Sequence, residues 1–230
     1  MLELDGVHAG YGRSTVLHGV SLTVPADGVV AVLGHNGAGK STLLRTAIGL
    51  IEPRSGAVRF EGKDITRLAP HRRIALGMAY VPQGQQCFPH LTAAENLQLV
   101  ADGRTGGRAA IAEALDLFPG LRSLMGRRAG LLSGGQRQQL AISRALVTKP
   151  RLLLLDEPTE GIQPSVVEEI QRTILALASR GRLSVLLVEQ HVGFALRAAH
   201  HYHVLQSGQV VSAGKGGVGA APTVREALTV

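Results

Sequence analysis

The residues best suited to chemistry lie in one stretch, 29–42, which reads VVAVLGHNGAGKST. It contains the spacing G-x-x-x-x-G-K-S, whose glycines let successive backbone N–H groups point at one anion. We expect Lys40 to reach the β- and γ-phosphates of a nucleotide and the Ser41 hydroxyl to ligate Mg²⁺. The stretch therefore predicts a nucleoside-triphosphate site. Its predicted cofactor-binding residues are Gly34, His35, Asn36, Gly37, Ala38, Gly39, Lys40, Ser41 and Thr42.

Two elements must position this loop. The valine-rich run 29–33 is typical of a strand buried in a parallel sheet, and the apolar periodicity of 42–50 predicts a helix. A helix that starts at Gly39–Lys40 adds the positive end of its dipole to the anion site. Strand, loop and helix together are the context that a phosphate-binding loop requires.

A second set of chemical residues follows the four leucines of 152–155, which predict a strand buried on both faces. Asp156, at the carboxyl end of that strand, is placed to hold Mg²⁺, and Glu157 is placed to orient or deprotonate the attacking water. Alternatively, the pair is a solvated strand end. The phosphate loop upstream favours the metal site.

Three further features are ambiguous on their own. Tyr11, before the phosphate loop, either stacks on an adenine ring or is an ordinary strand tyrosine. Gln83, after a predicted strand, either faces Mg²⁺ and the attacking water or is a surface amide. The segment 133–136, Ser-Gly-Gly-Gln before the predicted helix 137–148, resembles a second anion site, and one ATP site does not explain two anion loops.

The rest of the chain predicts a single α/β domain. Alternating apolar residues in 2–24 suggest antiparallel strands, the segment from about 85 to 150 has the character of an inserted helical lobe, and 183–188 is a further buried strand. The glycine-rich tail of about 214–230 predicts a mobile segment.

Composition narrows the class of protein. The chain has 230 residues, of which 45% are hydrophobic and 18% charged, and no run of about 18 uncharged apolar residues. Its N-terminus lacks a signal-peptide pattern and Cys87 is its one cysteine, so we expect a cytoplasmic protein without an internal disulfide. The net charge of +7 invites a nucleic-acid or membrane-surface partner, but the arginines are scattered and only 3% of residues are aromatic, which argues against nucleic acid.

From about residue 2 to residue 213 the sequence closely resembles the ATPase subunit of ATP-binding cassette transporters. The motif that carries the resemblance is 132–136, Leu-Ser-Gly-Gly-Gln, just before the leucines and acids of 152–157. The resemblance implies a P-loop NTPase (RecA-like) core with an antiparallel β subdomain and an inserted α-helical subdomain. It also implies head-to-tail pairs, in which each ATP lies between the phosphate loop of one chain and the Ser-Gly-Gly-Gln segment of the other.

The same resemblance assigns roles to individual residues. Tyr11 would stack on adenine, Gln83 would sense Mg²⁺ and the membrane partner, and Glu157 would act on water. The residues that would close on the partner's γ-phosphate are Ser133, Gly134, Gly135 and Gln136.

Two departures from the family pattern concern hydrolysis rather than ATP binding. Gln163 stands where the family usually has an aspartate, and Gln190 aligns with the family's switch histidine, with His191 next to it. Either His191 substitutes by a shift in register, or this chain's own site hydrolyses ATP less well than its partner's. A catalytically weak regulatory subunit is the corresponding functional alternative.

The segments 80–84, 88–92 and 188–190 look like the branched-chain amino-acid importer group, and 127–130, 138–142 and 158–165 look most like the urea importer ATPases. The resemblance thus implies an ATPase at the cytoplasmic face of the membrane that drives uptake of urea, or alternatively of branched-chain amino acids. Its partners would be a second ATPase subunit, two permeases and, through them, a solute-binding protein. A cassette ATPase acting on nucleic acid is the remaining alternative, and neither a coiled coil nor a second phosphate loop supports it.

Overall fold

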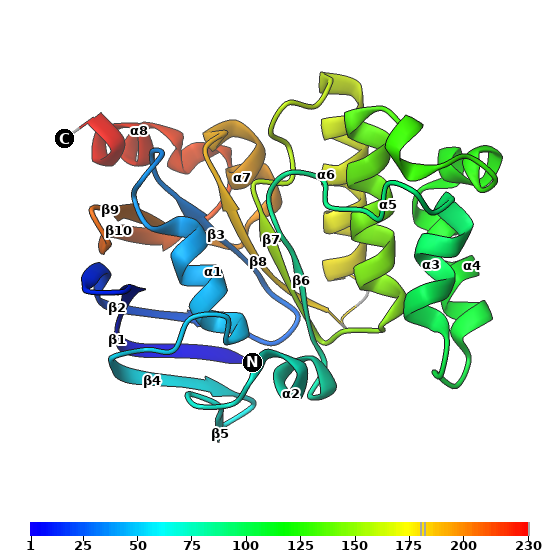
Figure 1. Ribbon diagram of the computed structural model, residues 1–230. Coiled ribbons are helices and arrows are strands. Elements are labelled where there is room, and N and C mark those ends of the chain that lie inside the picture. The colour runs from blue at the N-terminus through cyan, green and yellow to red at the C-terminus, as the bar shows by residue number, and fades with distance from the viewer. Residues whose placement is uncertain (180, 182, 230) are drawn as a thin grey trace.

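The computed structural model describes residues 1–179, 181 and 183–229 and contains two sheets flanked by helices (Figure 1). The strands are β1 (Leu2–Tyr11), β2 (Ser14–Val24), β3 (Val29–Leu33), β4 (Ser55–Phe60), β5 (Lys63–Asp64), β6 (Met78–Val81), β7 (Leu152–Asp156), β8 (Ser184–Glu189), β9 (His201–Gln206) and β10 (Gln209–Lys215). The α-helices are α1 (Lys40–Ile48), α2 (Pro70–Ala75), α3 (Ala93–Ala101), α4 (Gly107–Leu117), α5 (Gly134–Val147), α6 (Pro164–Ser179), α7 (Val192–Ala198) and α8 (Ala221–Thr229). Three short 3₁₀ segments are η1 (Pro119–Leu124), η2 (Ala129–Leu131) and η3 (Val218–Ala220).

The larger sheet has the strand order β10-β9-β3-β8-β7-β6, and every neighbouring pair except β9–β10 is parallel. All residues of β3, β7 and β8 are buried because the sheet is covered on both faces. Within β3, residues 29, 31 and 33 join one hydrophobic cluster and residues 30 and 32 join the other, as the alternation of a strand requires. The predicted α/β core is confirmed.

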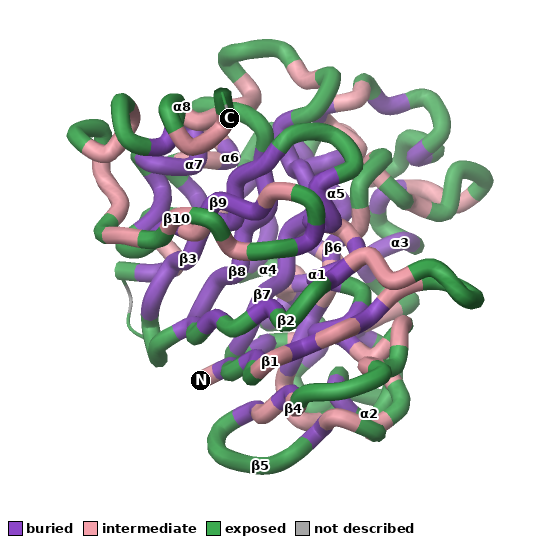
Figure 2. Tube along the Cα trace, turned by 90° about the vertical axis from the view of Figure 1, so that its left-hand side faces the viewer, coloured by how far each residue is buried: buried purple, intermediate pink, exposed green. Residues whose placement is uncertain are grey.

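The smaller sheet, in the order β2-β1-β4-β5, is antiparallel throughout, as predicted. Its apolar face, which includes Leu2, Leu4 and Val7, is part of the same cluster as Leu43 and Leu44 of α1. The helix α1, which follows the phosphate loop, therefore lies between the two sheets (Figures 1 and 2). Most of its residues are buried, because side chains of both sheets pack against it.

The helices α3, α4 and α5 form a separate layer on the far side of β6 from α1 (Figure 1). They lie within the segment for which the sequence predicts a helical lobe. Two of them begin with a capping box: Thr92 and Glu95 cap α3, and Ser133 and Gln136 cap α5. Among the described residues, no helix has the length and apolar character needed to cross a bilayer.

The C-terminal segment differs from the mobile tail that its glycines predict. It forms α8, whose Val224 is fully buried in the larger core cluster. The glycines before it permit close packing instead. The N–H of Gly216 donates to His200 O at 2.7 Å, and a Cβ atom at residue 216 would lie 1.9 Å from Ala199 O. The N–H of Gly217 is bonded to Leu196 O at 2.9 Å.

A buried arginine joins α1 to the segment that follows β5. Arg73 is 1% exposed, and its guanidinium donates to the carbonyls of Thr46 and Ala47 near the C-terminus of α1 and to those of Thr66 and Leu68, all at 2.8–2.9 Å. Burial lowers its pKa to about 10, so the group is still charged at neutral pH. Its charge favours the negative end of the α1 dipole.

We predict that Arg73→Met lowers the free energy of unfolding by about 3 kcal/mol, because it leaves several buried carbonyls without a donor. The matched control is Arg72→Met, since Arg72 is exposed on the same helix. Urea denaturation of both variants measures the difference. Equal stability of the two variants would contradict the structural role of Arg73.

Candidate nucleotide and metal site

The phosphate loop, residues 34–42, follows β3 and leads into α1. Gly37 and Gly39 have φ values of 82° and 104°, in the left-handed region that favours glycine. A Cβ atom at Gly34 would lie 2.4 Å from Leu205 O, so only glycine lets the loop pass β9. The loop borders a cavity of about 350 Å³. Its lining residues are Val16, Asn36, Gly37, Gly39, Lys40, Ser41, Thr42, Gln83 and Glu157.

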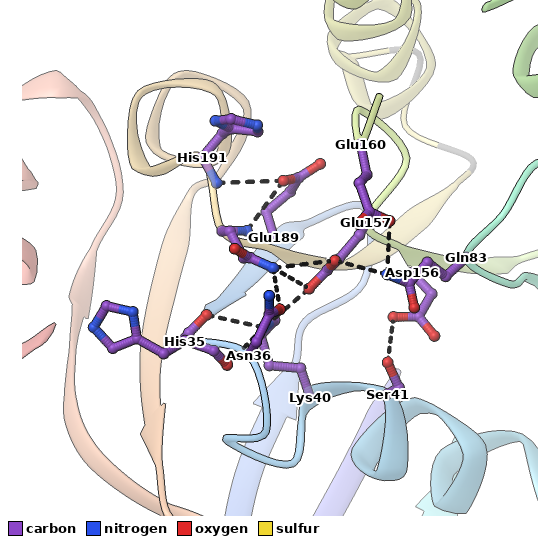
Figure 3. A network of polar contacts seen from close by, with 12 residues as sticks. His35, Asn36, Lys40, Ser41, Gln83, Asp156, Glu157, Glu160, Glu189 and His191 are labelled. Carbon is purple, nitrogen blue, oxygen red and sulfur yellow. Dashed lines mark hydrogen bonds and ion pairs between the residues drawn. The ribbon is translucent and has the colours of Figure 1, made fainter. Parts of the chain in front are cut away.

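Lys40 is turned into this loop. Its Nζ atom donates to Gly34 O at 2.9 Å and His35 O at 3.0 Å, and it lies 3.0 Å from Glu157 Oε1 (Figure 3). Lys40 is 4% exposed and Glu157 6%, so water screens the ion pair little. A phosphate group entering the loop competes with Glu157 for the ammonium group.

Two oxygen-bearing side chains lie where a cation is predicted. Ser41 Oγ donates to Asp156 Oδ1 at 2.9 Å, and Tyr80 Oη donates to Asp156 Oδ2 at 2.9 Å. Burial raises the pKa of Asp156, while these two hydroxyl donors lower it. The hydroxyl and the carboxylate are the hard ligands that Mg²⁺ prefers, and Mg²⁺ takes its remaining ligands from water and substrate phosphates. The described residues contain no cluster of three or more acidic, histidine or cysteine side chains that could hold a metal without the nucleotide.

Glu157 occupies an unusual backbone conformation at the end of β7. Its φ is 45°, and its N–H donates to Val188 O at 3.0 Å. A non-glycine residue in this region is strained, and strain of this kind is concentrated at functional sites. Gln83 Nε2 donates to Glu157 Oε2 at 3.1 Å and to Glu160 Oε2 at 2.7 Å (Figure 3). Gln83 is exposed to solvent, and its side-chain amide is turned toward the two carboxylates.

Gln190, and not His191, lies beside Glu157. Gln190 Nε2 is 3.3 and 3.4 Å from the two carboxylate oxygens of Glu157 and also contacts Asn36 Oδ1. The His191 ring points away from Glu157, and the backbone N–H of His191 donates to Glu189 Oε2 at 3.4 Å (Figure 3). The register shift that would let His191 substitute is not present, because β8 ends at Glu189 and Gln190 follows it directly into the site.

Glu189 is a buried carboxylate that the sequence analysis did not single out. It is 1% exposed, and burial raises its pKa. Thr159 donates to it from both its hydroxyl and its N–H, and the N–H groups of Gln190 and His191 donate to its other oxygen. Glu189 thereby ties the turn after β7 to the end of β8. An acidic residue ending an otherwise apolar strand is the signal that could have found it.

Tyr11 and His35 make side-chain hydrogen bonds that the sequence did not predict. The Tyr11 side chain is 46% exposed, and its hydroxyl accepts a hydrogen bond from Arg45 at 2.9 Å. The backbone of His35 belongs to the phosphate loop, but its ring turns outward and its Nε2–H donates to Leu228 O of α8 at 2.8 Å.

The segment 133–136 begins α5 and is separate from the phosphate loop. Ser133 Oγ accepts from Gln136 N at 3.3 Å, and Gln136 Oε1 accepts from Ser133 N at 3.0 Å. A Cβ atom at Gly135 would lie 2.9 Å from Val166 of α6, so glycine is needed for this packing. None of these residues lines the phosphate-loop cavity.

The comparisons with known proteins agree with this geometry. Residues 17–160 match the family model described as ABC transporter. The chain is 43% identical over 212 residues to the probable branched-chain amino acid transport ATP-binding protein LivF of Archaeoglobus fulgidus, covering 91% of this chain and 90% of that one. It is 40% identical to the high-affinity branched-chain amino acid transport ATP-binding protein BraG of Pseudomonas aeruginosa, covering 92% and 91%.

The chain belongs to the ABC transporter family. It is an ATP-binding cassette and an ATP hydrolase. A nucleotide-free ATP-binding cassette superposes with a TM-score of 0.88 at 28% identity, covering 98% of this chain and 95% of that one. A dimeric cassette in a post-hydrolysis state with ADP and phosphate gives a TM-score of 0.83 at 27% identity, covering 94% and 98%.

We predict that Gln190→Ala lowers the turnover number for ATP by about a hundredfold, because Glu157 loses a donor in a buried site. His191→Ala is the matched control and is expected to keep nearly full turnover, since its ring points away. The measurement is the steady-state rate of ATP hydrolysis by each purified variant, compared with that of the wild-type protein. A greater loss in the His191 variant would contradict the placement described above.

Proposed function

We propose that this cassette is the ATPase subunit of an importer of branched-chain amino acids. The observation that carries the proposal is the buried arrangement of Lys40, Asp156 and Glu157, in a chain that is 40–43% identical to two branched-chain amino acid transport ATPases. ATP binding would free Glu157 from Lys40, and Ser41 and Asp156 would hold Mg²⁺ against the phosphates. Glu157, oriented by Gln83 and Gln190, would then act on the attacking water.

The active form is a head-to-tail dimer. One chain keeps its Ser-Gly-Gly-Gln segment away from its own phosphate loop, so a second cassette is needed to bring the two together. The backbone N–H groups at the start of α5 suit an anion, because helix N-termini attract negative charge. In such a dimer Ser133, Gly134, Gly135 and Gln136 would close on the partner's γ-phosphate, and Tyr11 would stack on adenine. ATP closes the dimer because it binds the closed state more tightly than the open state.

The choice of amino acid over urea rests on the relatives. Segments of the sequence look most like urea importer ATPases, but the two relatives named above are branched-chain amino acid transport proteins. No residue of the ATP site touches the transported solute, so the site itself does not distinguish the two. Two permeases, with a solute-binding protein on their outer side, would hold the cassette at the cytoplasmic face of the membrane.

We predict that cells lacking this subunit lose uptake of labelled leucine and retain uptake of labelled urea. Wild-type protein is expected to restore leucine uptake. The matched control is Glu157→Gln, which keeps the size of the side chain but removes the carboxylate and so should not restore uptake. Loss of urea uptake with normal leucine uptake would overturn the proposed solute and leave the ATPase assignment intact.

A further inference from the structure

The carboxylate of Asp156 is held by two hydroxyl groups, one on each oxygen. Ser41 holds Oδ1 and Tyr80 holds Oδ2, each at 2.9 Å. Asp156 is 1% exposed, so these donors replace water, and a buried carboxylate without them would be costly. In the proposed function Ser41 turns to the metal and no longer serves the carboxylate. Tyr80 is then the hydroxyl that still orients it.

The sheet places Tyr80 for this task. Residue 80 on β6 pairs with Leu154 on β7, and Asp156 lies two residues further along β7 on the same face. The ring of Tyr80 packs against the cluster that contains Leu154, so its direction is fixed by packing. Its hydroxyl can thus reach along the neighbouring strand to the carboxylate at the strand end.

Arg45 of α1 contacts Tyr11, the tyrosine expected to stack on adenine. The guanidinium donates to Tyr11 Oη at 2.9 Å. Interactions with the phenols of Tyr11 and, more weakly, Tyr80 raise the pKa of Arg45. Arg45 thus ties the tyrosine expected under the adenine to the helix that also carries Ser41.

We propose that Tyr80 is a positioning residue that holds Asp156 in the orientation needed to bind the divalent cation together with ATP. The proposal rests on the proposed function, in which Asp156 serves the metal. Groups that orient a metal ligand typically change metal affinity by 10–100-fold when they are removed. A tyrosine that merely satisfied a buried carboxylate would change folding stability and leave the Mg²⁺ enhancement of ATP binding unchanged.

The test measures how much Mg²⁺ strengthens ATP binding. ATP affinity is determined in excess EDTA and in saturating Mg²⁺, and the ratio of the two dissociation constants equals the gain in metal affinity by reciprocity. The Glu157→Gln background prevents turnover. The test variant is Tyr80→Phe, which keeps the ring and removes the hydroxyl. The control is Tyr202→Phe on β9, which is also largely buried and whose hydroxyl makes no hydrogen bond with the residues that the structure describes.

We expect Tyr80→Phe to lower the Mg²⁺ enhancement of ATP binding about tenfold or more, with unchanged ATP affinity in EDTA. Tyr202→Phe should keep the wild-type ratio. A wild-type ratio in Tyr80→Phe, or a lowered melting temperature with equal weakening in EDTA and Mg²⁺, would overturn the positioning role. Failure of the parent protein to bind ATP under both conditions would instead overturn the proposed function.

Discussion

The parallel register of β3, β7 and β8 is the constraint on which the site depends. The pairs Leu33↔Glu189 and Asp156↔Val188 bring the carboxyl ends of the three strands to one edge of the sheet. The phosphate loop leaves from the first strand, Asp156 ends the second and Glu189 ends the third. A shift of one residue in either pair would turn a charged side chain to the opposite face of a fully buried sheet.

At this edge of the sheet, the polar and charged side chains of the site are paired with one another. Lys40 pairs with Glu157, Ser41 with Asp156 and Gln190 with Glu157, so each group proposed to meet nucleotide, metal or water already has a partner. The side chains of the site are thus already close together, and they form hydrogen bonds and ion pairs with one another. A triphosphate with its metal can replace these contacts with stronger charge-assisted ones. This exchange explains how binding can release the strained Glu157 to act on water.

Much of this could be predicted from the sequence, because the signals are local. The phosphate-loop spacing and the apolar strands before Asp156 and after Gly181 depend on a few consecutive residues. The glycines of 214–219 suggested a mobile tail, whereas Gly216 is required by the close approach of Ala199, a contact that no local pattern reveals. The same holds for the partners of Tyr80 and Arg73, which come from distant strands and helices. Which of Gln190 and His191 faces Glu157 could be decided only from the structure, because it depends on the residue at which β8 ends.

In the proposed dimer, a complete ATP site takes its phosphate loop from one chain and its Ser-Gly-Gly-Gln segment from another. Mixing two inactive variants tests it most directly. Lys40→Ala destroys the phosphate loop and keeps the segment, whereas Ser133→Arg blocks the segment and keeps the loop. We expect each variant alone to hydrolyse almost no ATP and the mixture to regain hydrolysis, because a mixed dimer contains one intact composite site. A mixture no more active than the sum of its parts, or full activity of Ser133→Arg alone, would contradict it.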